Sequence, residues 1–125
     1  MTEPQHSRPH PIRVALIEDD PVFSRDIETT LSQAADLLLS AKASSLQQAH
    51  RLLAGAPLDV VLLDLGLPDG DGGTLIGRIK QAWPDCEVIV STVFEDENRV
   101  LEAIRAGATG YLLKQSSLHE IAAQI

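Results

Sequence analysis

Short, nearly continuous apolar runs alternate along this chain with longer segments whose apolar residues recur every three or four positions. The first pattern is typical of strands buried on both faces, and the second of helices with one buried face. Strands that alternate with helices form right-handed crossover units and lie in one parallel sheet. The alternation therefore predicts an α/β fold with helices on both faces of a parallel sheet.

The strands are expected at residues 12–17, 38–43, 58–63, 87–91 and 110–113. About five such units make a flavodoxin-like, doubly wound, five-stranded parallel sheet. With 125 residues, 44% of them hydrophobic, the chain is long enough for one domain with its own core. Aromatic residues make up only 3%, so this core is expected to be aliphatic.

The helices are expected between the strands. The first begins at Pro21 with Asp20 as its N-cap, and the second has Ser44 or Ser45 as its N-cap. The fourth is expected over residues 95–106. Apolar residues at helical spacing should face the core, among them Ala35 and Leu38 in the first helix and Val100, Leu101 and Ile104 in the fourth.

Composition restricts the class of partner and the compartment. A net charge of -8 argues against direct binding to a nucleic-acid backbone, which needs clustered Lys and Arg. The single cysteine, Cys86, forbids an intramolecular disulfide and fits a reducing compartment. No apolar stretch approaches the ~20 residues that cross a membrane, and no secretory signal begins the chain. The cytoplasm is the expected location, with no membrane partner.

The two ends of the chain differ from its middle. Residues 1–11 carry three prolines and few apolar residues, which predicts a disordered leader before a domain at 12–125. A last helix is expected to open at Ser116 or Ser117 and has no C-cap. We therefore expect this helix to be truncated and an output domain, absent from these residues, to follow.

Polar side chains stand at the ends of four predicted strands. Because the carboxyl ends of neighbouring parallel strands meet at one edge of the sheet, these groups are expected to converge. They are Glu18, Asp19 and Asp20 after the first strand, Asp64 after the third, Ser91 and Thr92 after the fourth, and Lys114 after the fifth.

This set of groups suits phosphoryl transfer. Carboxylates held together repel one another, so the site should favour a hard divalent cation such as Mg²⁺. Asp64 can act as a nucleophile and form an acyl phosphate. Lys114 supplies a positive charge for the transferred group, and the Thr92 hydroxyl supplies a hydrogen-bond donor. Gly66 lets a backbone carbonyl approach the metal closely.

Four segments carry a resemblance to a known family. They are Val14–Pro21, Val61–Gly70, Val88–Thr92 and Ala106–Lys114, and together they extend over nearly the whole chain from Ile12. In this order they resemble the receiver domain of a two-component response regulator. The resemblance implies a phosphorylation-dependent signalling switch rather than a dedicated enzyme, with a histidine kinase as phosphoryl donor.

The same resemblance implies roles for individual residues. Asp64 would be the phosphoacceptor and a Mg²⁺ ligand. Asp19 would bind Mg²⁺ directly, Glu18 would bind it through water, and the Gly66 carbonyl would be a further ligand. Asp20 matches no ligand position and is expected to remain a helix cap.

Three further residues match the family's switch. Thr92 and Tyr111 match the switch pair, in which the hydroxyl moves towards the phosphoryl group and the aromatic ring turns inward. Lys114 matches the lysine that contacts a phosphoryl oxygen. The face built by the fourth helix, fifth strand and fifth helix would then change its partner or form a homodimer.

The residue after Lys114 departs from the commonest receiver pattern. Many receivers have a cis proline there, whereas this chain has Gln115. Residues 107–114 without that proline most resemble receivers of the LuxR-type helix-turn-helix group. The implied output is transcription, with DNA bound only through a C-terminal output domain that these residues do not include.

Two features near the phosphoacceptor predict slow self-dephosphorylation. Gly66 and Phe94 stand where some receivers carry polar side chains that position the hydrolytic water. The methyl groups of Val93 could also narrow access to Asp64. A phospho-form lifetime of seconds would contradict this prediction.

The same residues bear on three other functions. A receiver-like protein-binding module that is not phosphorylated is the main alternative, although intact Asp64, Thr92 and Lys114 argue against it. A phosphatase that works through an aspartyl phosphate needs a general acid where this chain has Gly66. A flavin-binding domain fits the fold, but the loop after the first strand is acidic rather than a phosphate-cradling loop.

Overall fold

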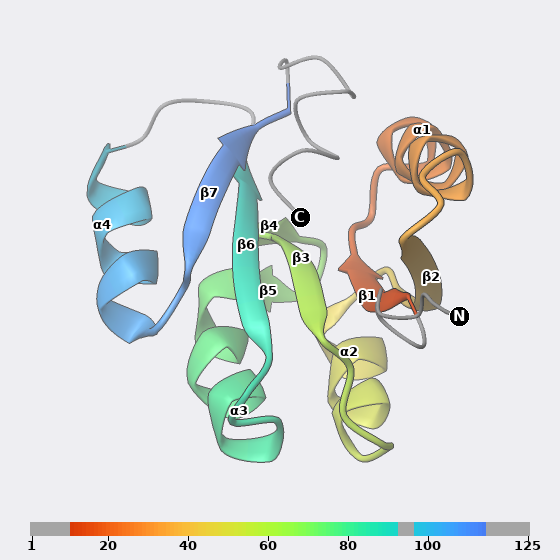
Figure 1. Ribbon diagram of the computed structural model, residues 1–125. Helices are drawn as coiled ribbons and strands as arrows, with labels where there is room; N and C mark the ends of the chain where they lie inside the picture. The colour runs from red at the N-terminus through yellow and green to blue at the C-terminus, as the bar shows by residue number, and fades with distance from the viewer. Residues whose placement is uncertain (1–10, 93–96, 115–125) are drawn as a thin grey trace.

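The computed structural model describes residues 11–92 and 97–114 (Figure 1). In this part of the chain five strands form one parallel sheet in the order β2-β1-β3-β6-β7. The order reverses between β1 and β3, which is the topological switch point of a doubly wound sheet. The strands are β1 (Ile12–Ile17), β2 (Leu37–Ala43), β3 (Val60–Asp64), β6 (Glu87–Thr92) and β7 (Gly110–Leu113).

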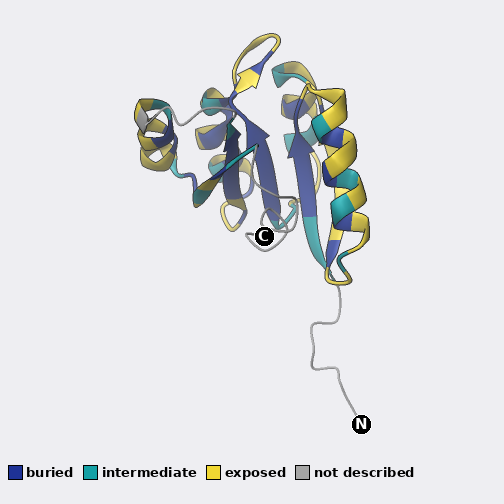
Figure 2. Ribbon diagram, turned by 90° about the horizontal axis from the view of Figure 1, so that it is seen from above, coloured by how far each residue is buried: buried dark blue, intermediate teal, exposed yellow. Residues whose placement is uncertain are grey.

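Helices cover both faces of this sheet, as the alternating pattern predicted. Alternate residues of each strand enter opposite cores: Val14 and Leu16 of β1 pack with α1, and Ala15 and Ile17 lie in the core of α2, α3 and α4. Figure 2 shows the strands buried and the helices exposed on their outer sides. The helices are α1 (Pro21–Ser32), α2 (Leu46–Leu53), α3 (Leu75–Ala82) and α4 (Glu97–Ala106).

The predicted helix caps are confirmed where the structure describes them. The Asp20 carboxylate accepts hydrogen bonds from the backbone N–H groups of Val22 and Phe23, so Asp20 is the N-cap of α1. Of the two serines considered for α2, Ser45 is the cap, and its hydroxyl accepts from the N–H of Gln48. The helix expected after Ser116 or Ser117 lies outside the described residues.

The first helix is shorter than predicted. It ends at Ser32, Ala35 is exposed, and Leu38 lies in β2 with 49% of its surface exposed. The strand begins at Leu37, which pairs with Ile12 of β1. The chain therefore pairs with β1 from Leu37 on, although the helical spacing of apolar residues continues to Leu38. Successive side chains of a strand point to opposite faces of the sheet, and on the edge strand β2 the side chain of Leu38 is left exposed.

The inward face of α4 also differs from the prediction. Val100 is buried as expected, but Leu101 and Ile104 are exposed, and Ala103 is the second buried residue. Residues 100 and 103 lie three apart on one helix face, and the small Ala103 lets α4 approach the core of α3 and β6 closely. Leu101 and Ile104 therefore form a neighbouring apolar stripe on the outer surface.

A short hairpin follows β3 and was not predicted. Strands β4 (Gly66–Leu67) and β5 (Gly70–Asp71) pair antiparallel and lead into a short 3₁₀ helix, Gly72–Thr74. In the turn, the Asp69 carboxylate accepts from the N–H groups of Leu46 (2.7 Å) and Gln47 (3.1 Å). These bonds lower the pKa of Asp69 and attach the hairpin to the first turn of α2.

The described helices are all too short or too polar to cross a lipid bilayer.

Candidate functional site

Three charged side chains from three strand ends meet at the carboxyl edge of the sheet. Glu18 follows β1, Asp64 ends β3, and Lys114 follows β7. The Lys114 ammonium lies between the two carboxylates, with Nζ 2.8 Å from Glu18 Oε2 and 3.2 Å from Asp64 Oδ2. The convergence expected from the strand ends is therefore present for these three groups.

The neighbouring elements hold this lysine in place. The Lys114 N–H donates to the Thr92 carbonyl at 2.8 Å, which extends the pairing of β6 and β7 by one step. Its ammonium also lies 5.0 Å from the centre of the Phe23 ring on α1. A cation over an aromatic face is stabilised by the ring's electron density. Phe23 is one of the apolar residues at helical spacing in α1, a position that does not by itself indicate a contact with Lys114.

Glu18, Asp19 and Asp64 together fit a divalent cation. One carboxylate oxygen from each lies within 4.8 Å of the other two. Glu18 and Asp64 are buried, and Asp19 is exposed at the mouth of the cluster. Glu18 Oε1 is buried with no hydrogen-bond partner among the described residues. A buried carboxylate oxygen without a donor is costly unless a cation or water binds it, so this donor set suits Mg²⁺.

The electrostatics of the site follow from this burial. Burial raises the pKa of Glu18 to about 7, and the nearby Asp64 adds to that rise, while Lys114 opposes it. Partial burial and the proximity of Asp64 also raise the pKa of Asp19. Burial alone would lower the pKa of Lys114, but Glu18 and Asp64 outweigh it and raise that pKa. The lysine is therefore charged at neutral pH.

Mg²⁺ binding is expected to strengthen as the pH rises, because a proton on Glu18 competes with the cation. With a pKa of about 7, the affinity should rise roughly tenfold from about pH 6 to about pH 8. Calorimetric titration of Mg²⁺ at several pH values measures this. Glu18→Gln is the control, and its affinity should be weaker and nearly constant with pH. If the Mg²⁺ affinity of Glu18→Gln depended on pH as strongly as that of the wild type, the competing proton would not be on Glu18.

The same pKa shift links pH to the stability of the metal-free protein. The folded state binds the Glu18 proton more tightly than the unfolded chain, whose ordinary pKa is 4.5. This contribution is fully present below about pH 4.5 and is lost as the pH rises through about 7. Bound Mg²⁺ should offset the loss, since it takes the place of the proton.

Thr92 and Tyr111 project from the same face of the sheet. In the register of β6 and β7, Tyr111 pairs with Val90, two residues before Thr92. Side chains two residues apart on a strand share a face, so the two groups are diagonal neighbours. Tyr111 is exposed at this edge of the sheet, with 45% of its surface accessible to solvent.

Gly66 and Gly72 bring backbone close to the phosphoacceptor candidate. The N–H of Gly66 donates to Asp64 Oδ1 at 3.0 Å. A Cβ on Gly72 would lie 2.1 Å from the Asp64 carbonyl oxygen, so only glycine fits there. Sequence reasoning singled out Gly66 but missed Gly72, because two adjacent glycines after an aspartate indicate only a turn. Val93 and Phe94 lie outside the described residues.

Comparison with known proteins places this architecture in a family. Residues 14–125 match the response regulator receiver domain. The chain belongs to this family. Receiver domains of this kind are signalling modules rather than dedicated enzymes, and the five-stranded parallel sheet is the receiver fold.

The receiver domain has relatives among transcriptional regulators. It is 33% identical over 110 residues to the uncharacterized transcriptional regulatory protein YxjL of Bacillus subtilis. The aligned region covers 88% of this chain and 50% of the relative. The chain thus spans about half the length of the curated relatives it matches.

Two solved structures are similar over most of the receiver domain. The receiver domain of the putative response regulator NarL from Mycobacterium tuberculosis has a TM-score of 0.86 and 27% identity, covering 93% of this chain and 94% of that one. A LuxR-family two-component response regulator from Aurantimonas sp. SI85-9A1 has a TM-score of 0.83 and 26% identity, covering 90% of this chain and 81% of that one. The resemblance to the LuxR-type group is thus confirmed.

Proposed function

We propose that this receiver domain accepts a phosphoryl group from a histidine kinase on Asp64 and thereby switches a transcriptional output. The observation that carries the proposal is the buried Asp64 carboxylate at the end of the central strand, with Lys114 beside it and a Glu18 oxygen that has no hydrogen-bond partner in the described part of the chain. These are the parts that a carboxylate nucleophile needs for phosphoryl transfer.

The reaction assigns a role to each charged group. The Asp64 carboxylate attacks phosphorus, an acyl phosphate forms, and the bond from phosphorus to the donor atom breaks. Lys114, now shared between Glu18 and Asp64, pairs with an oxygen of the transferred group. Mg²⁺, when bound, supplies positive charge that offsets repulsion between phosphate and carboxylates. Its ligands would be Asp19, Asp64, the Gly66 carbonyl and, through water, Glu18.

The switch would follow from the new charge on Asp64. The Thr92 hydroxyl donates to a phosphoryl oxygen and moves towards it, and the Tyr111 ring turns inward from its exposed position. The surface of α4 and β7, where Leu101 and Ile104 are also exposed, then changes its partner or forms a homodimer. A few kcal/mol of preference for one state is enough for this change.

The output would lie outside these residues. The curated relatives are about twice as long as the matched region and include transcriptional regulators. We propose that DNA binding by another part of the protein carries the response, since a charge of -8 does not suit DNA contact by the receiver domain. We place this exchange in the cytoplasm, a reducing compartment that the single Cys86 fits.

We also propose that the phosphorylated domain loses its phosphoryl group slowly by self-dephosphorylation. Gly66, two residues after Asp64, has no side chain that could act as a general acid or hold an attacking water. The domain would therefore store the phosphoryl group rather than turn over as a phosphatase.

Acetyl phosphate tests the proposal without a kinase. The intact protein, incubated with acetyl phosphate and Mg²⁺, is expected to gain the mass of one phosphoryl group, and the same mixture with excess chelator is expected to gain none. Unchanged mass in both mixtures, despite Mg²⁺ binding by calorimetry, would contradict phosphorylation from this donor. It would support a receiver-like binding module instead.

A further inference from the structure

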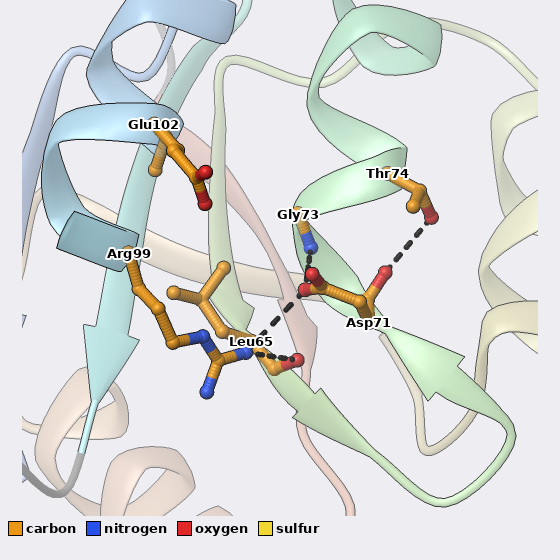
Figure 3. A pocket seen from close by; sticks show the side chains of 7 residues that line it. Leu65, Asp71, Gly73, Thr74, Arg99 and Glu102 are labelled. Atoms are coloured by element: carbon orange, nitrogen blue, oxygen red, sulfur yellow. Dashed lines mark hydrogen bonds and ion pairs between the residues drawn. The ribbon is translucent and has the colours of Figure 1, made fainter. Parts of the chain in front are cut away.

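A pocket of about 210 Å³ lies between α4 and the loop that follows β3. Figure 3 shows Arg99 and Glu102 reaching into it from α4, opposite Leu65, Asp71 and Thr74. Leu65 directly follows the phosphoacceptor candidate in the chain. The pocket wall therefore joins α4, which forms part of the proposed partner surface, to the backbone of the reaction site.

Arg99 binds the backbone of this loop. Its Nη2 donates to the Leu65 carbonyl at 3.2 Å and lies 3.4 Å from Asp71 Oδ1 (Figure 3). The pair with Asp71 is solvent-exposed on both sides and is expected to contribute little by itself. The bond to Leu65 differs, because that carbonyl also accepts from the Gly72 N–H at 2.8 Å and is held from two directions.

One peptide connects Arg99 to the Asp64 carboxylate. The Leu65 carbonyl and the Gly66 N–H belong to the same planar trans peptide and point in opposite directions. The carbonyl oxygen is held by Arg99, and the N–H donates to Asp64 Oδ1 at 3.0 Å. Holding the oxygen fixes the plane, so it also sets the direction from which the N–H approaches the carboxylate.

The charge of Arg99 strengthens the same connection. A guanidinium at a carbonyl oxygen polarises the peptide and makes its N–H a stronger donor, because consecutive hydrogen bonds reinforce one another. The oxygen Asp64 Oδ1 is thereby held by Gly66, and Oδ2 is held by Lys114. Both oxygens of the carboxylate are then fixed in orientation.

We propose that Arg99 is a positioning residue that acts through the Leu65–Gly66 peptide to orient the Asp64 carboxylate. The part of this inference that concerns reaction rate rests on the proposed function; the part that concerns the peptide does not. Because coupling between two sites is reciprocal, a change at Asp64 would also be felt at the first turn of α4.

The test compares Arg99→Met, which keeps an unbranched apolar stem and removes every donor, with Arg99→Lys, which keeps a charged donor. Glu102→Gln is the matched control, since it alters a charge in the same pocket without touching the peptide. The amide proton resonance of Gly66 is recorded by NMR in the metal-free protein. The rate constant of phosphorylation by acetyl phosphate is measured at saturating Mg²⁺.

Arg99→Met is expected to shift the resonance of the Gly66 amide proton upfield. It should also slow phosphorylation roughly three- to tenfold, which is the effect of losing one modest hydrogen bond. Arg99→Lys should keep the Gly66 resonance and the phosphorylation rate close to their wild-type values, and Glu102→Gln should change neither quantity. A Gly66 resonance and a rate that stay at wild-type values in Arg99→Met would overturn the inference. If the wild type takes up no phosphoryl group, the proposed function fails, and the Gly66 resonance still decides whether Arg99 holds the peptide.

Discussion

Asp64→Asn is expected to abolish phosphoryl incorporation from acetyl phosphate while the protein stays folded. The amide has nearly the same shape as the carboxylate, but it is not a nucleophile and cannot form an acyl phosphate. The change also removes one negative charge from the cluster with Glu18 and Asp19. Without Mg²⁺ the variant should stay about as stable as the wild type, since weaker repulsion offsets the lost ion pair with Lys114, which still pairs with Glu18.

The response to Mg²⁺ separates this expectation from misfolding. The wild type should gain about 2.7 kcal/mol of stability at a Mg²⁺ concentration about 100 times Kd, and Asp64→Asn should gain much less. Asp69→Asn makes the same chemical change in the same loop, at a carboxylate that accepts from the first turn of α2 instead. It should be phosphorylated like the wild type. Incorporation that persists in Asp64→Asn, or is lost in Asp69→Asn, would contradict the assignment.

Gly72→Ala is expected to destabilise the fold by about 3 kcal/mol, near the upper end of the usual cost of overpacking. The new Cβ would lie 2.1 Å from the Asp64 carbonyl oxygen and 3.1 Å from the Leu65 Cα. Backbone must move to relieve this overlap, and the backbone that moves carries the phosphoacceptor. The variant should therefore also be phosphorylated more slowly. Urea unfolding measures the first effect, and acetyl phosphate kinetics measure the second.

Gly77→Ala provides the matched control. Gly77 lies in α3, and a Cβ there would meet no atom of the described residues within 4 Å. Because alanine is the better helix former, this substitution should stabilise the protein by up to about 1 kcal/mol. If Gly72→Ala proves as harmless as Gly77→Ala, the close approach of Gly72 to Asp64 is not a constraint on the site.

The sheet and the charged cluster could be predicted because local patterns determine them. The uninterrupted apolar run before Asp64 predicts a buried strand, and the structure has β3 over Val60–Asp64. Parallel strands bring their carboxyl ends to one edge, so Lys114 could be expected near Asp64, from which it is 50 residues distant in sequence. A helix cap such as Asp20 is predictable because its side chain bonds backbone N–H groups only two or three residues further along the chain.

The remaining features depend on contacts that no local pattern encodes. In α4, Val100, Leu101, Ala103 and Ile104 offer two adjacent apolar stripes, and only packing against α3 and β6 selects the one that is buried. The bond from Arg99 to the Leu65 carbonyl joins residues that are 34 apart in the sequence. The hairpin β4–β5 depends on the close backbone approach at Gly72. A sequence indicates a turn and a helix there, but not which backbone atoms meet.

The most direct test of the account is to locate the phosphoryl group. Borohydride reduces an acyl phosphate on aspartate to homoserine, which peptide mass spectrometry can assign to a position. After treatment with acetyl phosphate and Mg²⁺, we expect homoserine at position 64, with Asp19, Asp20 and Asp69 unchanged. Homoserine at another aspartate, or incorporated phosphate without homoserine at position 64, would contradict the role assigned to Asp64.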